Sequence, residues 1–365
     1  MSKIRVGVVL GGRSGEHEVS LESARSVIGA LDRSRYDVAA IGINRDGTWL
    51  LQGDPLAILR DDSGEGDKGS EMIAPSTGNA MLSISGHASG DAGGAIDIVL
   101  PILHGPYGED GTIQGMLEMA DIPYVGSGVL GSAAGMDKGI MKAVFKEAGL
   151  PTARYRLVTA REWGADRDGL SAEITPEVGY PLFVKPANLG SSVGITKVHD
   201  RDELGPAVDL AATYDRRVIV EEAIEDAREI ECAVLGNDDP IASVCGEVFA
   251  AGEFYDYASK YEDNASRTEA PADLPESISG AIREMSVRAF KALDCAGLAR
   301  VDFLVRQSDQ AIFAIEANTM PGFTEISMYP KLWEASGLPY PELLDRLIEL
   351  GFERHRQRAE LRKGR

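Results

Sequence analysis

The chain has 365 residues, 44% of them hydrophobic, with a formal net charge of −21 and an isoelectric point near 4.7. This length suggests two or three domains. So acidic a chain is not expected to bind nucleic-acid backbones or anionic membranes, which disfavours both as partners. Three widely spaced cysteines cannot form a complete disulfide framework, and the apolar run at the N-terminus is too short for a signal sequence, so a cytoplasmic location is predicted.

The N-terminal segment has the pattern of a strand–helix–strand unit. Ile4–Leu10 is a continuous apolar run, typical of a parallel strand buried on both faces, and Val38–Ile43 reads as the next strand. The glycine turn between them, Gly11–Ser20, lacks the GxGxxG spacing, so a dinucleotide site is disfavoured. Glu16, near the N-terminus of the predicted helix, is better explained from this turn alone by the helix dipole than by ligand binding.

Residues 52–94 are rich in Gly, Ser and Asp and predict a flexible insertion. A further buried strand, Ile96–Leu103, ends at His104, and a helix is expected over Thr112–Met119. Ligands in open α/β sheets bind beyond the carboxyl ends of the strands, so His104 stands where a binding residue is expected. A lone histidine is nevertheless more often structural.

The central part of the chain contains a candidate phosphate-binding lid. A predicted helix, Met136–Ala148, contains Lys138 and Lys142, and Lys185 ends a predicted strand. The Gly-Ser-Ser tip that follows, at residues 190–194, offers unobstructed backbone N–H groups and hydroxyls, as a lid that grips phosphate requires. The alternative is an ordinary flexible hairpin loop.

Further strands and helices continue a mixed α/β pattern. One helix is expected between the strands Tyr155–Thr159 and Pro181–Lys185, and the end of the strand Arg217–Ile224 would suit an adenine in an apolar slot. The long polar segment Gly252–Asp273 contains several aromatic residues and predicts a lid or a disordered loop. The last helix is expected over Tyr340–Gly351, followed by a frayed basic tail.

Two β-type runs that flank Gln307–Gln310 predict a hairpin. Pairing Phe303 with Ile315 and Val305 with Phe313 puts every aromatic side chain of the hairpin on one face. Because side chains alternate between the faces of a strand, this register also decides which polar residues meet.

The same register sets Asp302 opposite Glu316, with Arg300 and Asn318 near by. Opposed Cβ atoms lie roughly 5 Å apart, so the two carboxylates repel unless a cation lies between them. A hard cation such as Mg²⁺ binds carboxylate and amide oxygens and shares substrate phosphates. A solvated outer face with one Arg–Asp pair is the alternative.

Six motifs, in order along the chain, make the sequence resemble the D-alanine–D-alanine ligases of the ATP-grasp superfamily. They cover nearly the whole length except the insertion near residues 52–94. They are the Gly-Gly-x-Ser-x-Glu sequence that contains Glu16, His-Gly-Pro-Tyr-Gly-Glu-Asp-Gly-Thr from His104, Gly-Met-Asp-Lys ending at Lys138, Lys185-Pro with Gly-Ser-Ser-Val-Gly, Phe-Tyr-Asp-Tyr-x-x-Lys-Tyr ending at Tyr261, and Arg300-x-Asp302 with Glu316-x-Asn318-x-x-Pro-Gly.

The resemblance implies an α/β (α+β) architecture, the three-domain ATP-grasp fold, which opens with a mostly parallel α/β sheet. Residues 1–126 would form a substrate-binding domain, 127–224 a central lid domain, and 225–365 a C-terminal domain with the metal site and a mobile loop at 252–273. The implied reaction is the ATP-dependent joining of two D-alanine molecules through a D-alanyl phosphate, for peptidoglycan synthesis. Two Mg²⁺ ions, or Mn²⁺ in their place, and a homodimer are also implied.

The resemblance also assigns roles to individual residues. Those implied in catalysis are Glu16, Ser191, Tyr261, Arg300 and Gly322. Those implied in D-alanine binding are His104, Lys260, Ser327 and Met328. Those implied in ATP binding are Lys138, Lys185, Ser192, Glu221, Glu222, Ile224 and Glu229, with either of the two adjacent glutamates at the adenine. The implied metal ligands are Asp302, Glu316 and Asn318.

Two other functions stay open. A ligase that joins D-alanine to D-lactate or D-serine would share the scaffold, but Tyr261 stands where the family's simple dipeptide-forming enzymes carry tyrosine. A catalytically inactive nucleotide sensor would have lost a metal ligand or Arg300, and none of these is lost.

Overall fold

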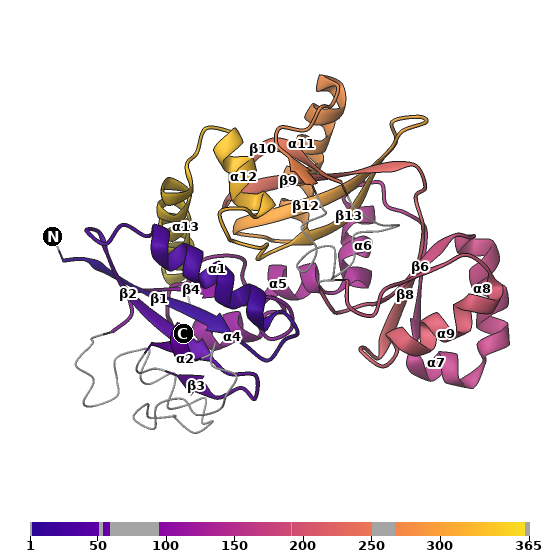
Figure 1. The fold of residues 1–365 in the computed structure, drawn as a ribbon, viewed down its shortest axis with the longest axis horizontal. Helices are drawn as coiled ribbons and strands as arrows, with labels where there is room; N and C mark the ends of the chain where they lie inside the picture. Colours follow the sequence, from indigo (N-terminus) through magenta and orange to yellow (C-terminus); the bar gives the residue numbers. More distant parts are fainter. Residues whose placement is uncertain (1, 51–53, 59–94, 191, 250–266, 362–365) are drawn as a thin grey trace.

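A computed structural model describes residues 2–50, 54–58, 95–190, 192–249 and 267–361 of the chain. Within these ranges, three β-sheets with packed helices make up the fold (Figure 1). None of the helices in the described part of the chain combines the length and apolar character needed to cross a bilayer. Of the predicted insertion at 52–94, only a short helix, α2 (Pro55–Ile58), and the residue before it lie within the described ranges.

The first sheet is mostly parallel, as predicted, with the order β3-β2-β1-β4. Alternate residues of its central strand pack against helices on opposite faces, which is why that strand is apolar throughout. The elements are β1 (Ile4–Gly11), α1 (His17–Ala30), β2 (Tyr36–Ile43), β3 (Trp49–Leu50), β4 (Ile98–Ile102) and α4 (Thr112–Met119).

The second sheet is antiparallel, with the order β5-β8-β6-β7, and has a core formed entirely by its own strands and helices. Two helices stand where one was expected, because Asp166 ends the first and caps the second by accepting a hydrogen bond from Gly169 N. The elements are β5 (Tyr155–Thr159), α7 (Ala160–Ala165), α8 (Arg167–Val178), β6 (Leu182–Pro186), β7 (Thr196–Val198), α9 (Arg201–Ala211) and β8 (Arg217–Glu222).

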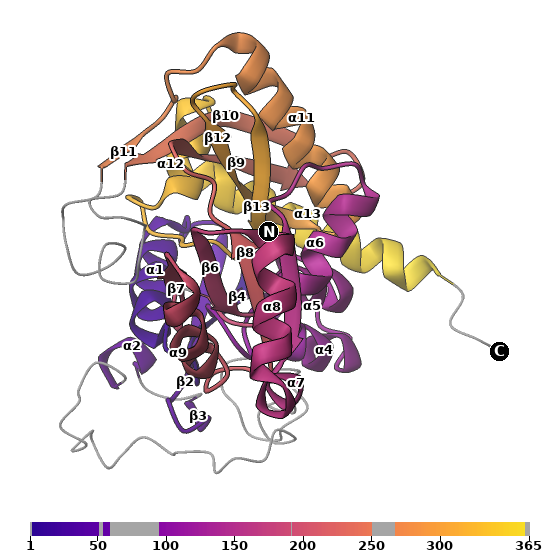
Figure 2. The ribbon, with the colours of Figure 1, turned by 90° about the vertical axis from the view of Figure 1, so that its right-hand side faces the viewer.

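The third sheet has the order β11-β10-β9-β12-β13 and is covered on both faces. Helices α6 and α11 pack on one face, and α12 and α13 on the other (Figures 1 and 2). Its strands are β9 (Ala227–Gly236), β10 (Ile241–Phe249), β11 (Arg267–Glu269), β12 (Gly297–Arg306) and β13 (Ile312–Asn318). The helices are α5 (Val129–Met136), α6 (Lys138–Glu147), α11 (Glu276–Ala292), α12 (Met328–Ala335) and α13 (Tyr340–Glu360).

The β12–β13 hairpin is confirmed, but only half of its predicted register is right. Asp302 pairs with Glu316, as expected. Beyond this pair the register shifts by one residue, so that Phe303 pairs with Ala314, and the predicted Phe303–Ile315 and Val305–Phe313 pairs are wrong. The bulge leaves Ile315 without an opposite residue. The aromatic side chains therefore separate: Phe303 is buried in the core, whereas Phe313 lines a cleft.

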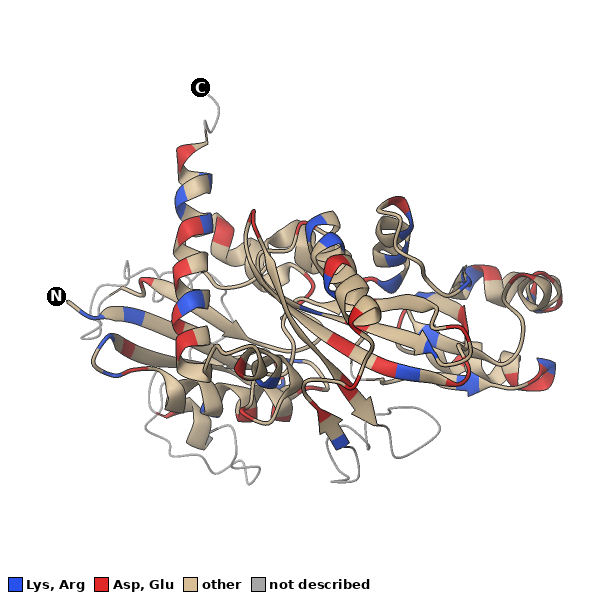
Figure 3. Ribbon diagram, turned by 90° about the horizontal axis from the view of Figure 1, so that it is seen from above, with Lys and Arg blue, Asp and Glu red and all other residues tan. Residues whose placement is uncertain are grey.

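Helix α13 joins the first and third sheets into one hydrophobic core. It continues nine residues beyond the predicted end at Gly351, to Glu360, and is not simply a frayed tail. The Arg354 guanidinium lies 4.0 Å from the centre of the Tyr124 ring, and Arg358 forms an ion pair with Glu118. Both acidic and basic residues occur along the part of α13 that projects from the body (Figure 3).

The three sheets use residues 4–102, 155–222 and 227–318. Helices α5 and α6, although they precede the second sheet in sequence, pack against β13 of the third. The domain boundaries at 126 and 224 remain predictions.

Candidate active site

Two cavities meet between the sheets. The larger, of about 990 Å³, is lined by residues of the second and third sheets, including Lys185 and Phe313. The smaller, of about 560 Å³, lies between the loops that follow β1 and β4 and the third sheet. Lys138, Glu229 and Glu316 line both cavities, so a ligand in one can reach a ligand in the other along this shared wall.

Lys138 is placed at this junction by the start of helix α6. Asp137 caps the helix by accepting hydrogen bonds from Gly139 N and Ile140 N, so Lys138 begins its first turn. Its ammonium donates to the Leu189 carbonyl oxygen at 2.7 Å and lies 3.7 Å from Glu316 Oε2. A cation at this point is suited to an anionic group shared by the two cavities.

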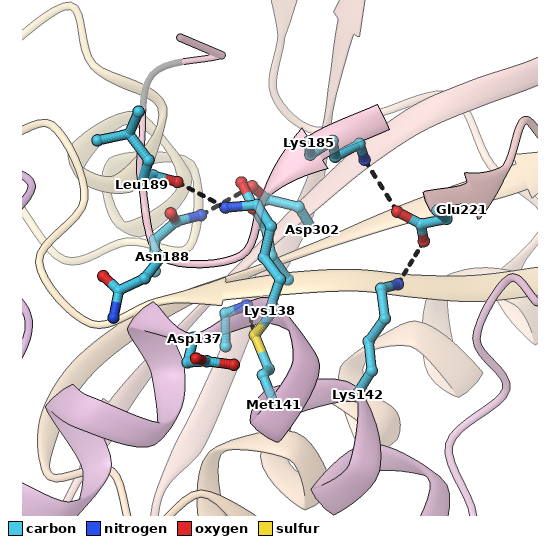
Figure 4. A network of polar contacts seen from close by, with 12 residues as sticks. Asp137, Lys138, Met141, Lys142, Lys185, Asn188, Leu189, Glu221 and Asp302 are labelled. Atoms are coloured by element: carbon cyan, nitrogen blue, oxygen red, sulfur yellow. Dashed lines mark hydrogen bonds and ion pairs between the residues drawn. The ribbon is translucent and has the colours of Figure 1, made fainter. Parts of the chain in front are cut away.

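A buried carboxylate holds two lysines beside the larger cavity (Figure 4). Glu221 Oε2 accepts from Lys185 Nζ at 2.9 Å, and Glu221 Oε1 accepts from Lys142 Nζ. Burial alone would raise the pKa of Glu221, but the two ammonium groups outweigh it and lower that pKa to about 2. Burial opposes protonation of both lysines. It lowers the pKa of Lys142, whereas the nearby carboxylates leave the pKa of Lys185 raised.

The neighbouring residues of the predicted adenine slot also line the larger cavity. Glu222 is held by Arg154, whose Nε and Nη2 donate to its carboxylate at 2.9 and 3.0 Å. Ile224 follows on the connector to β9, and Glu229 lies on β9 itself. The structure therefore brings both Glu221 and Glu222 to the cavity wall, with only Glu221 bound to the lysines.

The hairpin brings the predicted metal ligands to the smaller cavity. Asp302, Glu316 and Asn318 all line it, and Asn318 Nδ2 donates to Asp302 Oδ2 at 2.9 Å. The described residues contain no cluster of three or more His, Cys, Asp and Glu side chains able to hold a metal ion; here the third donor is an amide. Two carboxylates and an amide oxygen suit a hard divalent cation, so these residues fit such an ion.

Arg300 lies beside these ligands. Its Nε and Nη2 each donate to one oxygen of Asp302 at 2.7 Å, and its Nε lies 3.1 Å from Glu231 Oε2. Burial opposes the charge on Arg300, but the carboxylates of Asp302 and Glu231 raise its pKa well above the usual value. Arg300 therefore remains a cation beside the predicted metal ligands.

Glu16 and His104 also line the smaller cavity. The His104 ring is buried between the Met320 carbonyl oxygen, 3.0 Å from Nδ1, and Ser23 Oγ, 3.1 Å from Nε2. Burial opposes protonation, yet the hydrogen bond and charge of Glu109, with the charge of Glu16, raise the pKa of His104. His104 therefore belongs to a network of polar and charged residues and is not an isolated histidine in the hydrophobic core.

The loop after β13 completes the smaller cavity. Gly322, Ser327 and Met328 line it, and Ser327 is the N-cap residue of helix α12. Ser327 Oγ accepts a hydrogen bond from Thr324 N at 3.0 Å and lies 2.8 Å from Thr324 Oγ1, which fixes the hydroxyl near the helix N-terminus. Such a terminus favours a carboxylate.

Three predicted residues, Ser191, Lys260 and Tyr261, lie outside the described residues, as does most of the expected mobile loop at 252–273. Ser192 is described and lines both cavities.

The structure also adds three residues to the site that the sequence reading had given no role: Lys142, Glu109 and Glu231. Lys142 stands four residues after Lys138, so both lie on one face of the helix. This spacing is the sequence feature that could have predicted Lys142 as part of the site. Glu109 belongs to the His104 motif. Nothing in the sequence linked Glu231 to Arg300.

Comparisons with known proteins identify the family of this chain. The family model described as D-ala D-ala ligase N-terminus matches residues 5–127, and that described as D-ala D-ala ligase C-terminus matches residues 144–349. D-alanine–D-alanine ligases from Acetivibrio thermocellus and Heliobacterium modesticaldum are each 49% identical to this chain, over 97% and 98% of it respectively and 97% of each relative.

Solved structures give the same result. The D-alanine–D-alanine ligase from Coxiella burnetii has a TM-score of 0.84 and 36% identity, covering 99% of this chain and 97% of its own. The VanG D-Ala:D-Ser ligase from Enterococcus faecalis has a TM-score of 0.82 and 36% identity, covering 96% of this chain and 100% of its own. The chain therefore belongs to the D-alanine–D-alanine ligase family.

Proposed function

We propose that this chain joins two D-alanine molecules into the dipeptide D-alanyl-D-alanine, with ATP converted to ADP and phosphate. The dipeptide would serve as a precursor for peptidoglycan synthesis. The observation that carries the proposal is the shared wall of the two cavities at Lys138 and Glu316. A nucleotide in the larger cavity would present its terminal phosphate to a carboxylate in the smaller one.

The reaction has two steps. A carboxylate oxygen of the first D-alanine attacks the terminal phosphorus, the bond to ADP breaks, and an acyl phosphate forms. The amine of the second D-alanine, after losing a proton, attacks the acyl carbon, and inorganic phosphate leaves. Phosphoryl transfer depends chiefly on positioning and charge neutralisation, for which the chain provides buried and half-buried cations.

On the nucleotide side, Lys138, Lys185 and Ser192 would hold phosphates. The Ile224 backbone and the side chain of Glu221 or Glu222 would border the adenine, and Glu229 would bond the ribose. All of these residues line the larger cavity, which supports this assignment. Ser191 and Tyr261, which lie outside the described residues, would close over the reaction and exclude water that would hydrolyse an acyl phosphate. Lys260, also outside the described residues, would contribute to D-alanine binding.

On the amino-acid side, Glu16 would bind the first ammonium group, with His104 adjacent. Arg300 and the backbone N–H of Gly322 would stabilise the oxyanion at the attacked carbon. Ser327 and Met328, at the start of α12, would hold the second carboxylate. Asp302, Glu316 and Asn318 would hold two Mg²⁺ ions, with Mn²⁺ as a substitute, which would neutralise phosphate charge when bound.

The second candidate is a D-alanine–D-serine ligase, because one solved relative carries that name at 36% identity. The relatives at 49% identity are named D-alanine–D-alanine ligases, which favours the dipeptide of two alanines. We also propose a cytoplasmic homodimer, which sedimentation of the purified protein would test.

The test of function is product formation from ATP. Phosphate release and products are measured with D-alanine alone and with D-alanine plus D-serine or D-lactate. We expect D-alanyl-D-alanine to predominate in every mixture. Preferential formation of the mixed product would replace the proposal with the second candidate, and ATP binding with no ligation would support a nucleotide sensor.

A further inference from the structure

Lys142 is a buried lysine that lies behind the wall of the larger cavity, the proposed nucleotide site. Only 1% of its side chain is exposed, and it is not among the described residues that line either cavity. Its ammonium contacts Glu221 Oε1 and lies 5.9 Å from the centre of the Tyr155 ring. The position is set by helix α6, which begins at Lys138, so one helix carries a lysine at the cavity and another behind it.

Glu221 divides its two oxygens between two lysines of different exposure. Oε1 accepts from Lys142, and Oε2 accepts from Lys185 at 2.9 Å. Of these two lysines only Lys185 lines the cavity. Figure 4 shows both ammonium groups at the Glu221 carboxylate. The group of three carries one net positive charge, which is available to an anion only through Lys185.

The second lysine matters once a phosphate binds. If Lys185 turns toward a phosphate, Glu221 loses that counter-ion, and a buried carboxylate without a partner is unfavourable. Lys142 cannot leave with Lys185, because it lies behind the wall. Its charge therefore keeps Glu221 neutralised while Lys185 moves.

We propose that Lys142 is a positioning residue for nucleotide binding: it holds Glu221 as an ionised, oriented acceptor and frees Lys185 for the phosphates. This inference rests on the proposed ATP-dependent function. An ionised carboxylate only accepts hydrogen bonds. It therefore matches the exocyclic amino group of a 6-aminopurine and repels the carbonyl oxygen of a 6-oxopurine. Lys142 thus contributes to nucleotide selectivity without contacting the nucleotide.

The test is a double-mutant cycle on Lys142 and Glu221, read by the dissociation constants of ATP and inosine triphosphate, measured by calorimetry without D-alanine. Lys142→Met should weaken ATP binding about tenfold, because Glu221 then retains Lys185. It should also reduce the preference for ATP over inosine triphosphate. Lys146→Met, on an exposed position one turn further along α6, is the matched control and should change neither value.

The cycle separates this role from simple packing. In a Glu221→Gln background there is no carboxylate to neutralise, so adding Lys142→Met should not weaken ATP binding further. A packing role would instead give the same loss in both backgrounds, and that result would overturn the proposal. The comparison within the Glu221→Gln background remains decisive if the single Lys142→Met variant does not fold.

Failure of this inference can be told from failure of the proposed function. A wild-type protein that prefers ATP to inosine triphosphate but forms no D-alanyl-D-alanine would refute the function and leave the role of Lys142 in place. Dipeptide formation together with additive effects in the cycle would retain the function and remove Lys142 from nucleotide binding.

Discussion

Gly190, which follows β6, lies against the Glu16 side chain in the loop after β1. A Cβ built at Gly190 would lie 2.8 Å from Glu16 Oε2. That oxygen is the end of a flexible side chain, so Gly190→Ala should displace the Glu16 carboxylate and leave the fold intact. We expect the KM for D-alanine to rise about tenfold, with little change in the melting temperature. Steady-state kinetics and thermal unfolding measure both.

The control for this prediction is Gly164→Ala. Gly164 lies on α7, and a Cβ there has no neighbouring atom within 4 Å. Its D-alanine kinetics should match those of the wild type. If Gly190→Ala kept the wild-type KM, Glu16 would not need its present position for substrate binding.

His104 gives a pH dependence whose sign follows from its environment. Its pKa is raised above 6.5 despite burial, chiefly by Glu109. A raised pKa contributes stability that is fully present below the unfolded-state value and is lost as pH rises through the folded-state value. Glu109→Gln should lower the pKa of His104, as NMR titration of the imidazole would report. The stability difference between wild type and variant should shrink as pH rises above neutrality. Identical titration curves would show that Glu109 does not control His104.

At the scale of the elements, the β12–β13 hairpin shows what the sequence could and could not predict. Alternation of apolar residues correctly placed Asp302 opposite Glu316, but the bulge at Ile315 leaves no mark in that alternation. The other predicted residues of the two cavities came from the resemblance to a known family, which rests on short local motifs. Glu231 was not linked to Arg300, because their contact depends on the pairing of β9 with β12.

The paired carboxylates of this hairpin give a prediction for Glu316→Gln. The change removes one of two negative charges at the predicted metal site, so turnover should fall at least about 100-fold. Stability without metal should change little, because the lost contact with Lys138 is offset by relief of repulsion from Asp302. Mn²⁺ binding in the presence of ADP, followed by electron paramagnetic resonance, should weaken in parallel.

Glu334→Gln is the matched control for Glu316→Gln, since Glu334 is an exposed carboxylate on α12. Its Mn²⁺ affinity and turnover should equal those of the wild type. Unchanged Mn²⁺ affinity in Glu316→Gln would remove Glu316 from the metal site.

At the scale of the molecule, the three sheets are not equally coupled. The first and third sheets share one core through α12 and α13, whereas the core of the second sheet contains only residues between 158 and 220. The second sheet and its helices also extend to one side of the other two in Figure 1. A unit with its own core can move without exposing apolar surface elsewhere. The second sheet is therefore the part of the described structure best suited to open and close over a nucleotide.

The last prediction measures that movement between two exposed positions, Arg25 on α1 and Ala172 on α8. Spin labels on cysteines introduced there should give a shorter, narrower distance distribution when ATP analogue and D-alanine are added. A second pair, at Arg25 and Arg356 on α13, spans the shared core and should keep one distance in both states. The native cysteines are all buried, which keeps the labels at the chosen sites. Closure around the second sheet would be refuted by an Arg25–Ala172 distance that ligands leave unchanged, or by an equal change in both pairs.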